Sequence, residues 1–405
     1  MALKRKAALG FILITLLIDV LGLGIIIPVV PSLITELTGG TLAQAAKYAG
    51  WLMFVYSIAQ FLFAPLLGSL SDRFGRRPIL LISLFGLGID YLFLTYAPSI
   101  GWLFVGRTIS GICGASLTTA SAYIADVSEP EKKTQNFGLI GVAFGVGFII
   151  GPVIGGIAGK FGTRIPFLIA ACFALLNFLY GLLLLPESLS PELRRPFSFR
   201  RSNPAGAMAQ LKKYPLIAGL ALSSFLLYLA SQSIQSTWTF FTMQLFKWDT
   251  AMVGLSLGFI GLLIALVQGV LIRVIIPKFG QKKCLYAGLA LNALGFLLFS
   301  LASKGWMMFV FLLPYALGGI AGPSLLGIIS NQVPDNEQGE LQGAMTSLVS
   351  LTAILGPPLM TYLFATFANK NAGVYFPGAP FLMGALIILL AIVFSVRSLS
   401  RHPQL

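Results

Sequence analysis

Apolar residues occur along this chain in long runs separated by short polar segments. Twelve of the runs are long enough for an α-helix to cross the roughly 30 Å of hydrocarbon in a bilayer, which takes about 20 residues. They lie near residues 8–31, 47–68, 78–97, 101–124, 137–159, 165–185, 215–241, 251–276, 284–303, 305–331, 341–367 and 377–398. The pattern predicts an all-α polytopic membrane protein with twelve transmembrane helices.

The polar segments differ in charge according to the side of the membrane on which they fall. The segments on the side of the two termini contain 20 of the 27 Lys and Arg residues, those on the opposite side contain six, and Arg107 lies within a run. Cytoplasmic loops of membrane proteins carry the excess of positive charge. Both termini are therefore predicted to be cytoplasmic.

Composition agrees with lipid as the main solvent. Hydrophobic residues make up 57% of the 405 residues and charged residues only 10%, which is too little polar surface to cover a water-soluble globule of this size. The net charge of +14 is spread between the runs and forms no single basic face, so no nucleic-acid partner is predicted. Cys113, Cys172 and Cys284 have neither metal-ligand nor disulfide spacing, and no metal is expected.

The two halves of the chain repeat one another. Three pairs of short segments match at offsets of 208, 205 and 205 residues and at the same places in the order of the runs. They are Gly111–Leu117 with Gly319–Leu325, Phe74-Gly75 with Phe279-Gly280, and Gly151-Pro152 with Gly356-Pro357. Such regular matches indicate a duplication.

The duplication predicts two pseudo-symmetric six-helix bundles joined by the longest polar connection. The predicted domains are residues 1–185, a cytoplasmic linker at 186–214 that is rich in Arg, Pro and Ser, and residues 215–405. Paired halves of this kind place their binding site near the middle of the bilayer, where the halves meet.

The loop after the second run combines glycines with charges of both signs. Asp72 is suited to a basic partner or to the N-terminus of the eleventh span, and Arg76 to Asp126 at the cytoplasmic end of the fourth span. Gly68 allows a close helix approach and Gly75 an unusual turn. The residues predicted to form a conformational switch here are Gly68, Asp72, Arg73, Gly75, Arg76, Arg77 and Asp126.

The fifth run has small residues at helical spacing. Gly147, Gly151 and Gly155 recur every four residues and make a smooth face against which another helix can rock, while Pro152 removes one helical hydrogen bond. Together with Gly156 these residues are assigned to the same switch, although ordinary tight packing explains the glycines alone.

The conjunction of these patterns resembles the major facilitator superfamily, whose loop between spans two and three has the form of residues 68–77. The segments Arg107–Gly114 and Gly147–Gly156 are similar to those of its drug:proton antiporter branch, and the second of them is characteristic of exporters. Within that branch the chain looks most like the tetracycline efflux antiporters, over nearly its whole length. The resemblance implies carboxylates for proton coupling and a polar pocket for a metal-chelated drug.

The chain departs from the tetracycline antiporters at two positions. Ile264 stands where those proteins carry a histidine in span eight, and Asn292 stands where they carry a carboxylate in span nine. These departures argue against recognition of a metal-bearing tetracycline cation more than against proton-coupled export.

Deep charges are scarce in the predicted spans. Asp19 and Asp90 are the deep carboxylates, and Asp90 and Arg107 both lie near 10 Å from the outer ends of neighbouring spans. A charge at mid-bilayer costs at least about 2.5–3.5 kcal/mol on insertion scales, so such residues face a cavity or a partner. We assign Asp19, Asp90 and Arg107 to proton coupling, with a purely structural ion pair as the alternative.

Uncharged polar residues offer a binding surface for a small amphipathic substrate. Apolar cavities with a few polar anchors are the usual form of such sites. The predicted substrate-binding residues are Gln60, Asp90, Arg107, Gln232, Gln235, Gln268 and Asn292.

Other classes of function find little support in the sequence. The span interiors contain no catalytic constellation, and no GxxxxGK[ST] phosphate-binding loop is present, so neither an enzyme nor an ATP-driven pump is predicted and no cofactor is expected. We expect a proton-coupled antiporter that works as a monomer in the inner membrane of a bacterium, with protons, a small molecule and lipid as partners. An exporter of an endogenous metabolite or siderophore, or an uptake symporter, remains the alternative.

Overall fold

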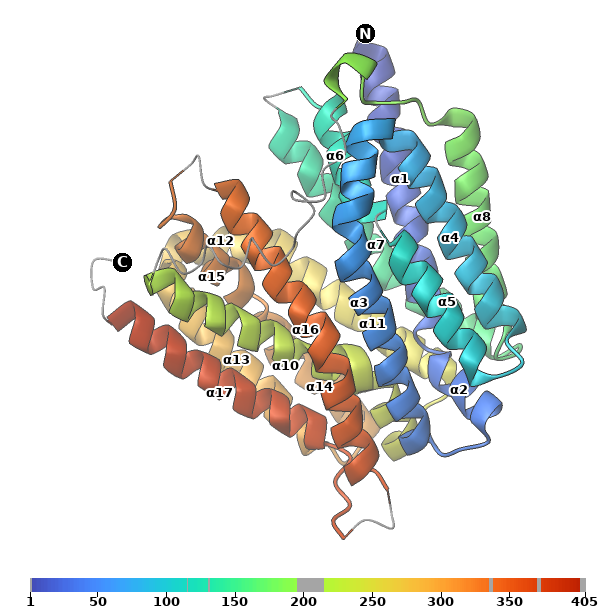
Figure 1. The fold of residues 1–405 in the computed structure, drawn as a ribbon. Coiled ribbons are helices and arrows are strands. Elements are labelled where there is room, and N and C mark those ends of the chain that lie inside the picture. The colour runs from blue at the N-terminus through green and yellow to red at the C-terminus, as the bar shows by residue number, and fades with distance from the viewer. Residues whose placement is uncertain are drawn as a thin grey trace. The chain divides into compact units, whose positions relative to one another are not determined.

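The computed structural model of the protein describes residues 2–114, 116–129, 132–194, 215–334, 338–369 and 373–400. Within these ranges every regular element is a helix (Figure 1). The helices of the first half are α1 (Ala2–Ile26), α2 (Val30–Thr38), α3 (Leu42–Phe74), α4 (Arg76–Tyr96), α5 (Ile100–Cys113), α6 (Ser116–Val127), α7 (Lys133–Gly159), α8 (Ile165–Leu184) and the short η2 (Pro191–Leu193). Those of the second half are α10 (Pro215–Phe246), α11 (Thr250–Leu266), the π-helical η4 (Val267–Leu271), α12 (Ile272–Phe279), α13 (Gln281–Ser300), α14 (Gly305–Gly318), α15 (Ala321–Ser330), α16 (Gln338–Phe367) and α17 (Ala379–Ser400).

Eleven of the twelve predicted spans are helices long and apolar enough, within the described residues, to cross a membrane. The twelfth is α10, which has 32 residues but carries many hydroxyl and amide groups along its middle. Ser236 and Thr237 are buried, and their hydroxyls donate to the carbonyl groups of Gln232 and Ser233 one turn earlier. Because these polar groups are satisfied within the helix, α10 remains compatible with a membrane environment.

The duplication predicted from the sequence is visible in the helices themselves. The fourth span is broken at Gly114, between α5 and α6, and the tenth is broken at Gly319 and Ile320, between α14 and α15. The turns that begin α4 and α13 both require glycine, since Gly75 has a φ of 108° and Gly280 a φ of 80°. The two halves therefore repeat their irregularities as well as their helices.

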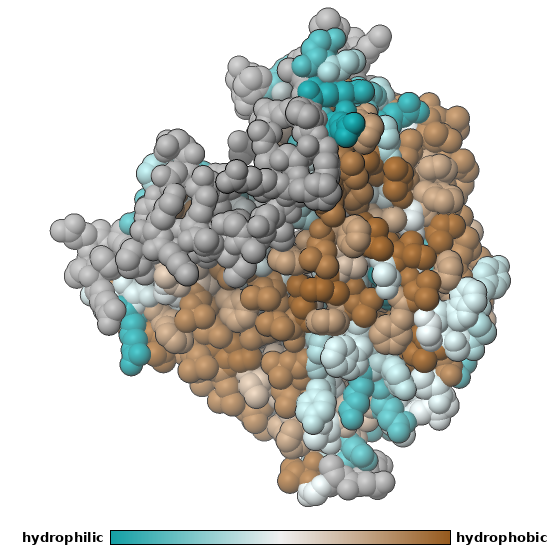
Figure 2. All heavy atoms as spheres, viewed as in Figure 1, coloured by the Kyte–Doolittle hydropathy of each residue, from teal (hydrophilic) through white to brown (hydrophobic). Residues whose placement is uncertain are grey.

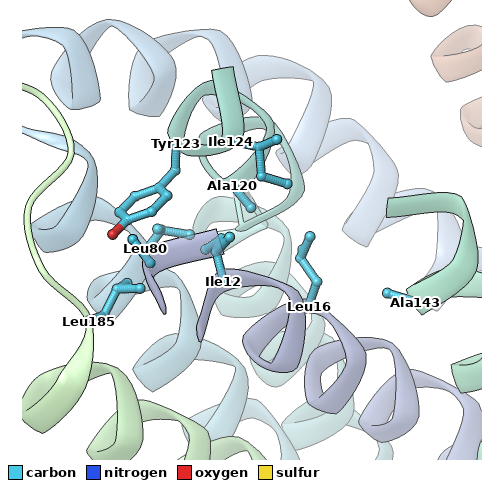
Figure 3. Close-up of a cluster of buried hydrophobic side chains, with 9 residues drawn as sticks. Ile12, Leu16, Leu80, Ala120, Tyr123, Ile124, Ala143 and Leu185 are labelled. Atoms are coloured by element: carbon cyan, nitrogen blue, oxygen red, sulfur yellow. The ribbon is translucent and has the colours of Figure 1, made fainter. Parts of the chain in front are cut away.

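The chain divides into two compact units. The first contains residues 1–39, 55–203 and 249–261. In it α1 packs against α7 and α8, and α4 packs against α8 and α5. A cluster of buried apolar side chains joins α1, α4, α6, α7 and the segment after α8 (Figure 3). The Tyr123 hydroxyl at its edge donates to the Pro186 carbonyl oxygen at 2.8 Å, which ties α6 to that segment.

The second unit contains residues 40–54, 204–248 and 262–405. In it α10 packs against α16 and α17, and α13 packs against α17 and α14, which are the counterparts of the contacts in the first unit. The prediction of domains at 1–185 and 215–405 stays a prediction. Most of the predicted linker, at 195–214, lies outside the described residues.

Large apolar side chains cover much of the surface, as Figure 2 shows for one face. Leu176, Leu183 and Val142 are all more than half exposed on α7 and α8. Exposed apolar surface on this scale is the expected exterior of a protein solvated by lipid.

Candidate functional site

Asp90 and Arg107 form an ion pair inside the first unit. Asp90 on α4 is completely buried, and its Oδ2 binds Nη2 of Arg107 on the neighbouring α5. A Cβ at Gly106 would lie 2.7 Å from Oδ1 of Asp90, so this glycine leaves room for the carboxylate. The contact predicted from the depth of the two residues in adjacent spans is present. Their role in proton coupling stays a prediction.

Asp19 lies on α1 with 9% of its surface exposed. The Ser116 hydroxyl donates to its Oδ2 at 2.6 Å. Ser116 is the first residue of α6, directly after the break in the fourth span. Sequence reasoning did not assign Ser116 to the site, and its only signal was its place in the segment that recurs as Gly319–Leu325.

Gln60, predicted to bind substrate, joins the break in the fourth span to an aromatic ring. Its Nε2 donates to the Gly114 carbonyl oxygen at 2.9 Å and to the Tyr56 hydroxyl at 3.2 Å. The Tyr56 ring in turn lies 5.9 Å from the guanidinium carbon of Arg107, within the range of a cation–π interaction. Tyr56 is therefore part of the same polar cluster, although nothing in its spacing along α3 predicted this.

A second cluster lies at the predicted cytoplasmic end of the first unit. Arg76 contacts Asp72 at 2.5 Å and Asp126 at 3.1 Å, and its Nη1 donates to Ser71 at 3.0 Å. The Ser188 hydroxyl also donates to Asp126, at 3.0 Å. The predicted pairing of Arg76 with Asp126 is present, whereas the contact of Asp72 with the start of the eleventh span stays a prediction.

Glu187 anchors the turn between α3 and α4. Its carboxylate accepts hydrogen bonds from the backbone N–H groups of Arg76 at 2.8 Å and Arg77 at 3.2 Å, so a negative charge satisfies orphan donors at the start of α4. It also fills the space beside Gly75. No sequence pattern marks Glu187 as a partner of this turn, because it lies 111 residues from Arg76 along the chain.

The remaining residues of the predicted switch loop, Arg77, Arg73 and Gly68, do not join the cluster around Arg76. Arg77 donates to the Leu182 carbonyl oxygen at 2.6 Å, and Arg73 lies over the ring of Phe74 at 5.1 Å. No described atom lies within 4 Å of the Cβ position of Gly68. The close helix approach predicted at Gly68 stays a prediction.

The glycines of α7 make one close helix contact with α1. A Cβ at Gly147 would lie 2.7 Å from Val20, one at Gly151 would lie 2.9 Å from Gly24, and one at Gly155 would overlap the Ile25 carbonyl oxygen. These three positions allow the two backbones to meet along more than two turns.

Another face of α7 receives the start of α11. The Thr250 hydroxyl donates to the Gly156 carbonyl oxygen at 2.9 Å, and a Cβ at Gly254 would overlap the Pro152 carbonyl oxygen. The glycine motif of the fifth span thus contacts two helices, α1 and the start of α11, while its predicted role in the conformational switch stays a prediction.

An ion pair closes the end of that contact. The Lys160 ammonium lies 3.1 Å from Asp249, whose Oδ1 accepts from the Met252 backbone N–H at 2.8 Å at the start of α11. The Met252 N–H and the Lys160 charge lower the pKa of the Asp249 carboxyl. Because the pKa is lowered, the carboxylate stays charged at neutral pH and the pairing is lost only as the pH falls below the ordinary aspartate range.

The predicted polar residues of the second unit fall into two groups. Gln232 and Asn292 are buried, the first against Gly356 of α16 and the second beside Gly318 of α14. Gln235 and Gln268 are exposed, on α10 and in the π-helical segment η4 respectively. Of the four residues, Gln235 and Gln268 therefore present their amide groups outside the packed interior. Gln268 also lies in a π-helical turn, and such turns occur often at functional sites.

No group of three or more His, Cys, Asp or Glu residues that could hold a metal ion occurs within the described part of the chain.

Comparisons with known proteins agree with this architecture. The family model described as Major Facilitator Superfamily matches residues 12–278 and 271–404. The tetracycline resistance protein of class C from Escherichia coli is 39% identical over 390 residues, which cover 96% of this chain and 96% of that protein. The class B protein from the same organism is 34% identical over 388 residues, with 94% of each chain covered. A crystal structure of the nucleoside transporter NupG superimposes with a TM-score of 0.77 over 96% of this chain and 98% of that one, at 15% identity.

Proposed function

We propose that this chain, which belongs to the Major Facilitator Superfamily, exports small amphipathic compounds in exchange for protons. The protein is an integral membrane transporter and not an enzyme. The observation that carries the proposal is the ion pair between the buried Asp90 and the partly buried Arg107 in the first unit. Placing charged side chains inside a membrane-spanning segment costs free energy. In membrane proteins such residues usually belong to ion and proton pathways.

The cluster around this pair supports proton coupling. When Asp90 takes up a proton it loses its attraction for Arg107, whose guanidinium then keeps the face of the Tyr56 ring as a partner. Asp19, held by Ser116, provides a second carboxylate in the same unit. Protonation thus alters which groups Arg107 holds, and this gives the transporter two electrostatic states.

The class of substrate is supported by the relatives, which are tetracycline resistance proteins. Ile264 and Asn292 stand where the resemblance to the tetracycline antiporters implies a histidine and a carboxylate. We therefore favour substrates without a chelated metal. Export of an endogenous metabolite or siderophore is the second candidate, because the polar residues of the second unit are uncharged amides that fit many organic ligands. The export-type motif of α7 disfavours uptake.

Alternating access is supported by two helices that contribute to both compact units. Residues 42–54 of α3 belong to the second unit and the rest of α3 to the first, while α11 passes from the first unit to the second after Gly261. The start of α3 meets α16 at Gly50 and Thr361, as the start of α11 meets α7. Each half of the chain thus contributes the start of one helix to the other unit, which suits transport by alternating access.

The direct test is transport into inverted vesicles that contain the purified chain. Tetracycline, ethidium and norfloxacin serve as probes, with accumulation driven by an imposed proton gradient. We expect at least one probe to accumulate and to be released when a protonophore collapses the gradient. Accumulation that ignores the protonophore, or that needs ATP, contradicts proton antiport.

Neutralising the Asp72 carboxylate should weaken transport without abolishing substrate binding. Asp72 and Arg76 belong to a charged cluster that we propose to latch the cytoplasmic side when it is shut, and Asp72→Asn removes one of the two carboxylates that hold Arg76. We expect the population of the outward-facing state to fall, as measured by spin-label distances. A collapse of substrate affinity with unchanged distances contradicts a latch.

Reporter fusions should place both termini in the cytoplasm. The reason is the excess of 20 Lys and Arg residues over six on the opposite side. Fusions at Ser202 and at the C-terminus should read cytoplasmic and one at Asn371 external, three positions that lie outside the described residues. A cytoplasmic reading at Asn371 overturns the orientation. We further propose the inner membrane of a bacterium as the location and a monomer as the working form.

A further inference from the structure

The Tyr91 hydroxyl is deeply buried and has no hydrogen-bond partner among the described residues. Tyr91 follows Asp90 directly on α4 and is 1% exposed, yet its Oη finds no donor or acceptor. Leaving a buried hydroxyl unpaired costs stability that a phenylalanine would not cost. A tyrosine in this place therefore needs an explanation other than packing.

The phenol reaches from α4 to the face of α1 that carries Asp19. A Cβ built on Gly22 would lie 3.3 Å from both Cε2 and Oη of Tyr91, so the absence of a side chain at Gly22 lets the hydroxyl approach α1. Gly22 follows Asp19 by three residues, which places both on one side of the helix. Tyr91 thus has its backbone beside Asp90 and its hydroxyl beside the helix of Asp19.

Charged and titratable groups of four helices interact electrostatically with this hydroxyl. They are Asp19 of α1, Tyr56 of α3, Asp90 of α4 and Arg107 of α5, with Cys113 of α5 beside Asp90. Oδ1 of Asp90 is a second buried atom without a well-formed hydrogen bond to the described residues, although the Ser110 side chain lies close to this carboxylate and Arg107 binds Oδ2. Two buried polar atoms without well-formed hydrogen bonds, one on each of two adjacent residues, point to groups that change their contacts in another state.

We propose that the Tyr91 hydroxyl relays protons between Asp90 and Asp19, an inference that rests on the proposed proton antiport. In the relay the carboxylic acid of Asp90 gives its proton to the Tyr91 oxygen while the phenol O–H bond breaks and its proton goes to the Asp19 carboxylate. The reverse transfer moves a proton the other way, and the phenol is unchanged after each event. Neither carboxylate bonds to the hydroxyl in this structure, so the relay requires both carboxylate side chains to rotate towards it.

The relay is tested by Tyr91→Phe, with Tyr180→Phe as the matched control. Tyr180 lies on α8 of the same unit, and its hydroxyl also has no hydrogen-bond partner in the described residues, but no carboxylate interacts with it. We expect Tyr91→Phe to reduce proton-driven accumulation of the best transported of tetracycline, ethidium and norfloxacin by about 10-fold. Counterflow of the same probe without a proton gradient should continue, since exchange needs no net proton transfer.

Two further readouts separate a relay from a packing role. The pH of half-maximal accumulation should shift by about half a unit or more in Tyr91→Phe, because the two carboxylates no longer share a proton path. The melting temperature in detergent should stay the same or rise, as a partnerless hydroxyl is removed. The control should leave accumulation and its pH profile as in the wild type.

Wild-type accumulation with an unchanged pH profile in Tyr91→Phe overturns the relay, as does an equal loss in Tyr180→Phe. If Asp90→Asn loses accumulation while Tyr91→Phe does not, the relay fails and the proposed antiport stands. If the wild type itself shows no proton-driven accumulation of any probe, the proposed antiport fails and the relay with it.

Discussion

Replacing Asp90 with asparagine is expected to abolish accumulation of substrate against its gradient while exchange down the gradient continues. The amide has nearly the size of the carboxylate but cannot take up and release a proton. In the wild type, inward movement of one positive charge across 100 mV supplies about 2.3 kcal/mol, which supports roughly a 50-fold gradient of a neutral substrate before any pH gradient is added. Inverted vesicles measure this accumulation, and counterflow without a proton gradient measures exchange.

The control for this substitution is Glu192→Gln, which removes the charge of an exposed carboxylate on η2. It should leave accumulation unchanged. Asp90→Asn alone leaves the partly buried Arg107 without its counter-charge, which destabilises the fold. The double variant Asp90→Asn, Arg107→Gln removes both charges and should recover folding, yet it should still fail to concentrate substrate.

Asp19→Asn should show either the same uncoupling or a milder shift in pH dependence, depending on which carboxylate carries the proton. Its contact with Ser116 favours retention of the fold, because the serine hydroxyl can bond to an amide oxygen as well. Full accumulation in the double variant Asp19→Asn, Asp90→Asn would assign both residues to structural roles.

Adding a single methyl group at Gly155 is expected to destabilise the protein severely. The Cβ of Gly155→Ala would overlap the Ile25 carbonyl oxygen of α1 and lie 2.6 Å from its carbonyl carbon. Backbone atoms cannot rotate away as a side chain can, so α1 and α7 would have to separate. Overpacking typically costs about 1–3 kcal/mol and occasionally more, and we expect about 3 kcal/mol here. Thermal unfolding in detergent, followed by size-exclusion chromatography, measures the loss.

Gly145→Ala is the matched control on the same helix. No described atom lies within 4 Å of the Cβ position of Gly145, so the substitution should be tolerated and, by helix propensity, stabilise α7 by up to about 1 kcal/mol. Equal melting temperatures for Gly155→Ala and Gly145→Ala would show that the contact of α7 with α1 can relax.

The sequence by itself determined the number and order of the spans and the duplication. A helix in a bilayer must form all its backbone hydrogen bonds internally and must be long enough to cross the hydrocarbon layer. The length of an apolar run is therefore enough to identify a span. The sequence also determined two ion pairs. Asp90 and Arg107 occur at equal depth in consecutive spans, and Arg76 and Asp126 occur at the same end of theirs, where opposite charges can meet.

Only the tertiary structure decided which residues complete these pairs. Ser116 binds Asp19 across 97 residues of sequence, and Glu187 caps α4 across 111. Neither residue has a periodicity or a motif that marks it, because such contacts depend on how helices distant in sequence pack. A single serine or glutamate beside a span end is compatible with many neighbours, and packing selects one.

For the glycine motif of α7, the sequence likewise predicted that a contact exists, and the structure showed which helices make it. Its spacing predicted a close helix contact, since glycines at every fourth position lie on one face. It could not specify the partner, because a smooth face accepts any helix of suitable shape. The structure assigns Gly147, Gly151 and Gly155 to α1 and Gly156 to the start of α11, a helix that lies almost 100 residues further along the chain. Shape complementarity between backbones decides this, and it exists only once both helices have formed and packed.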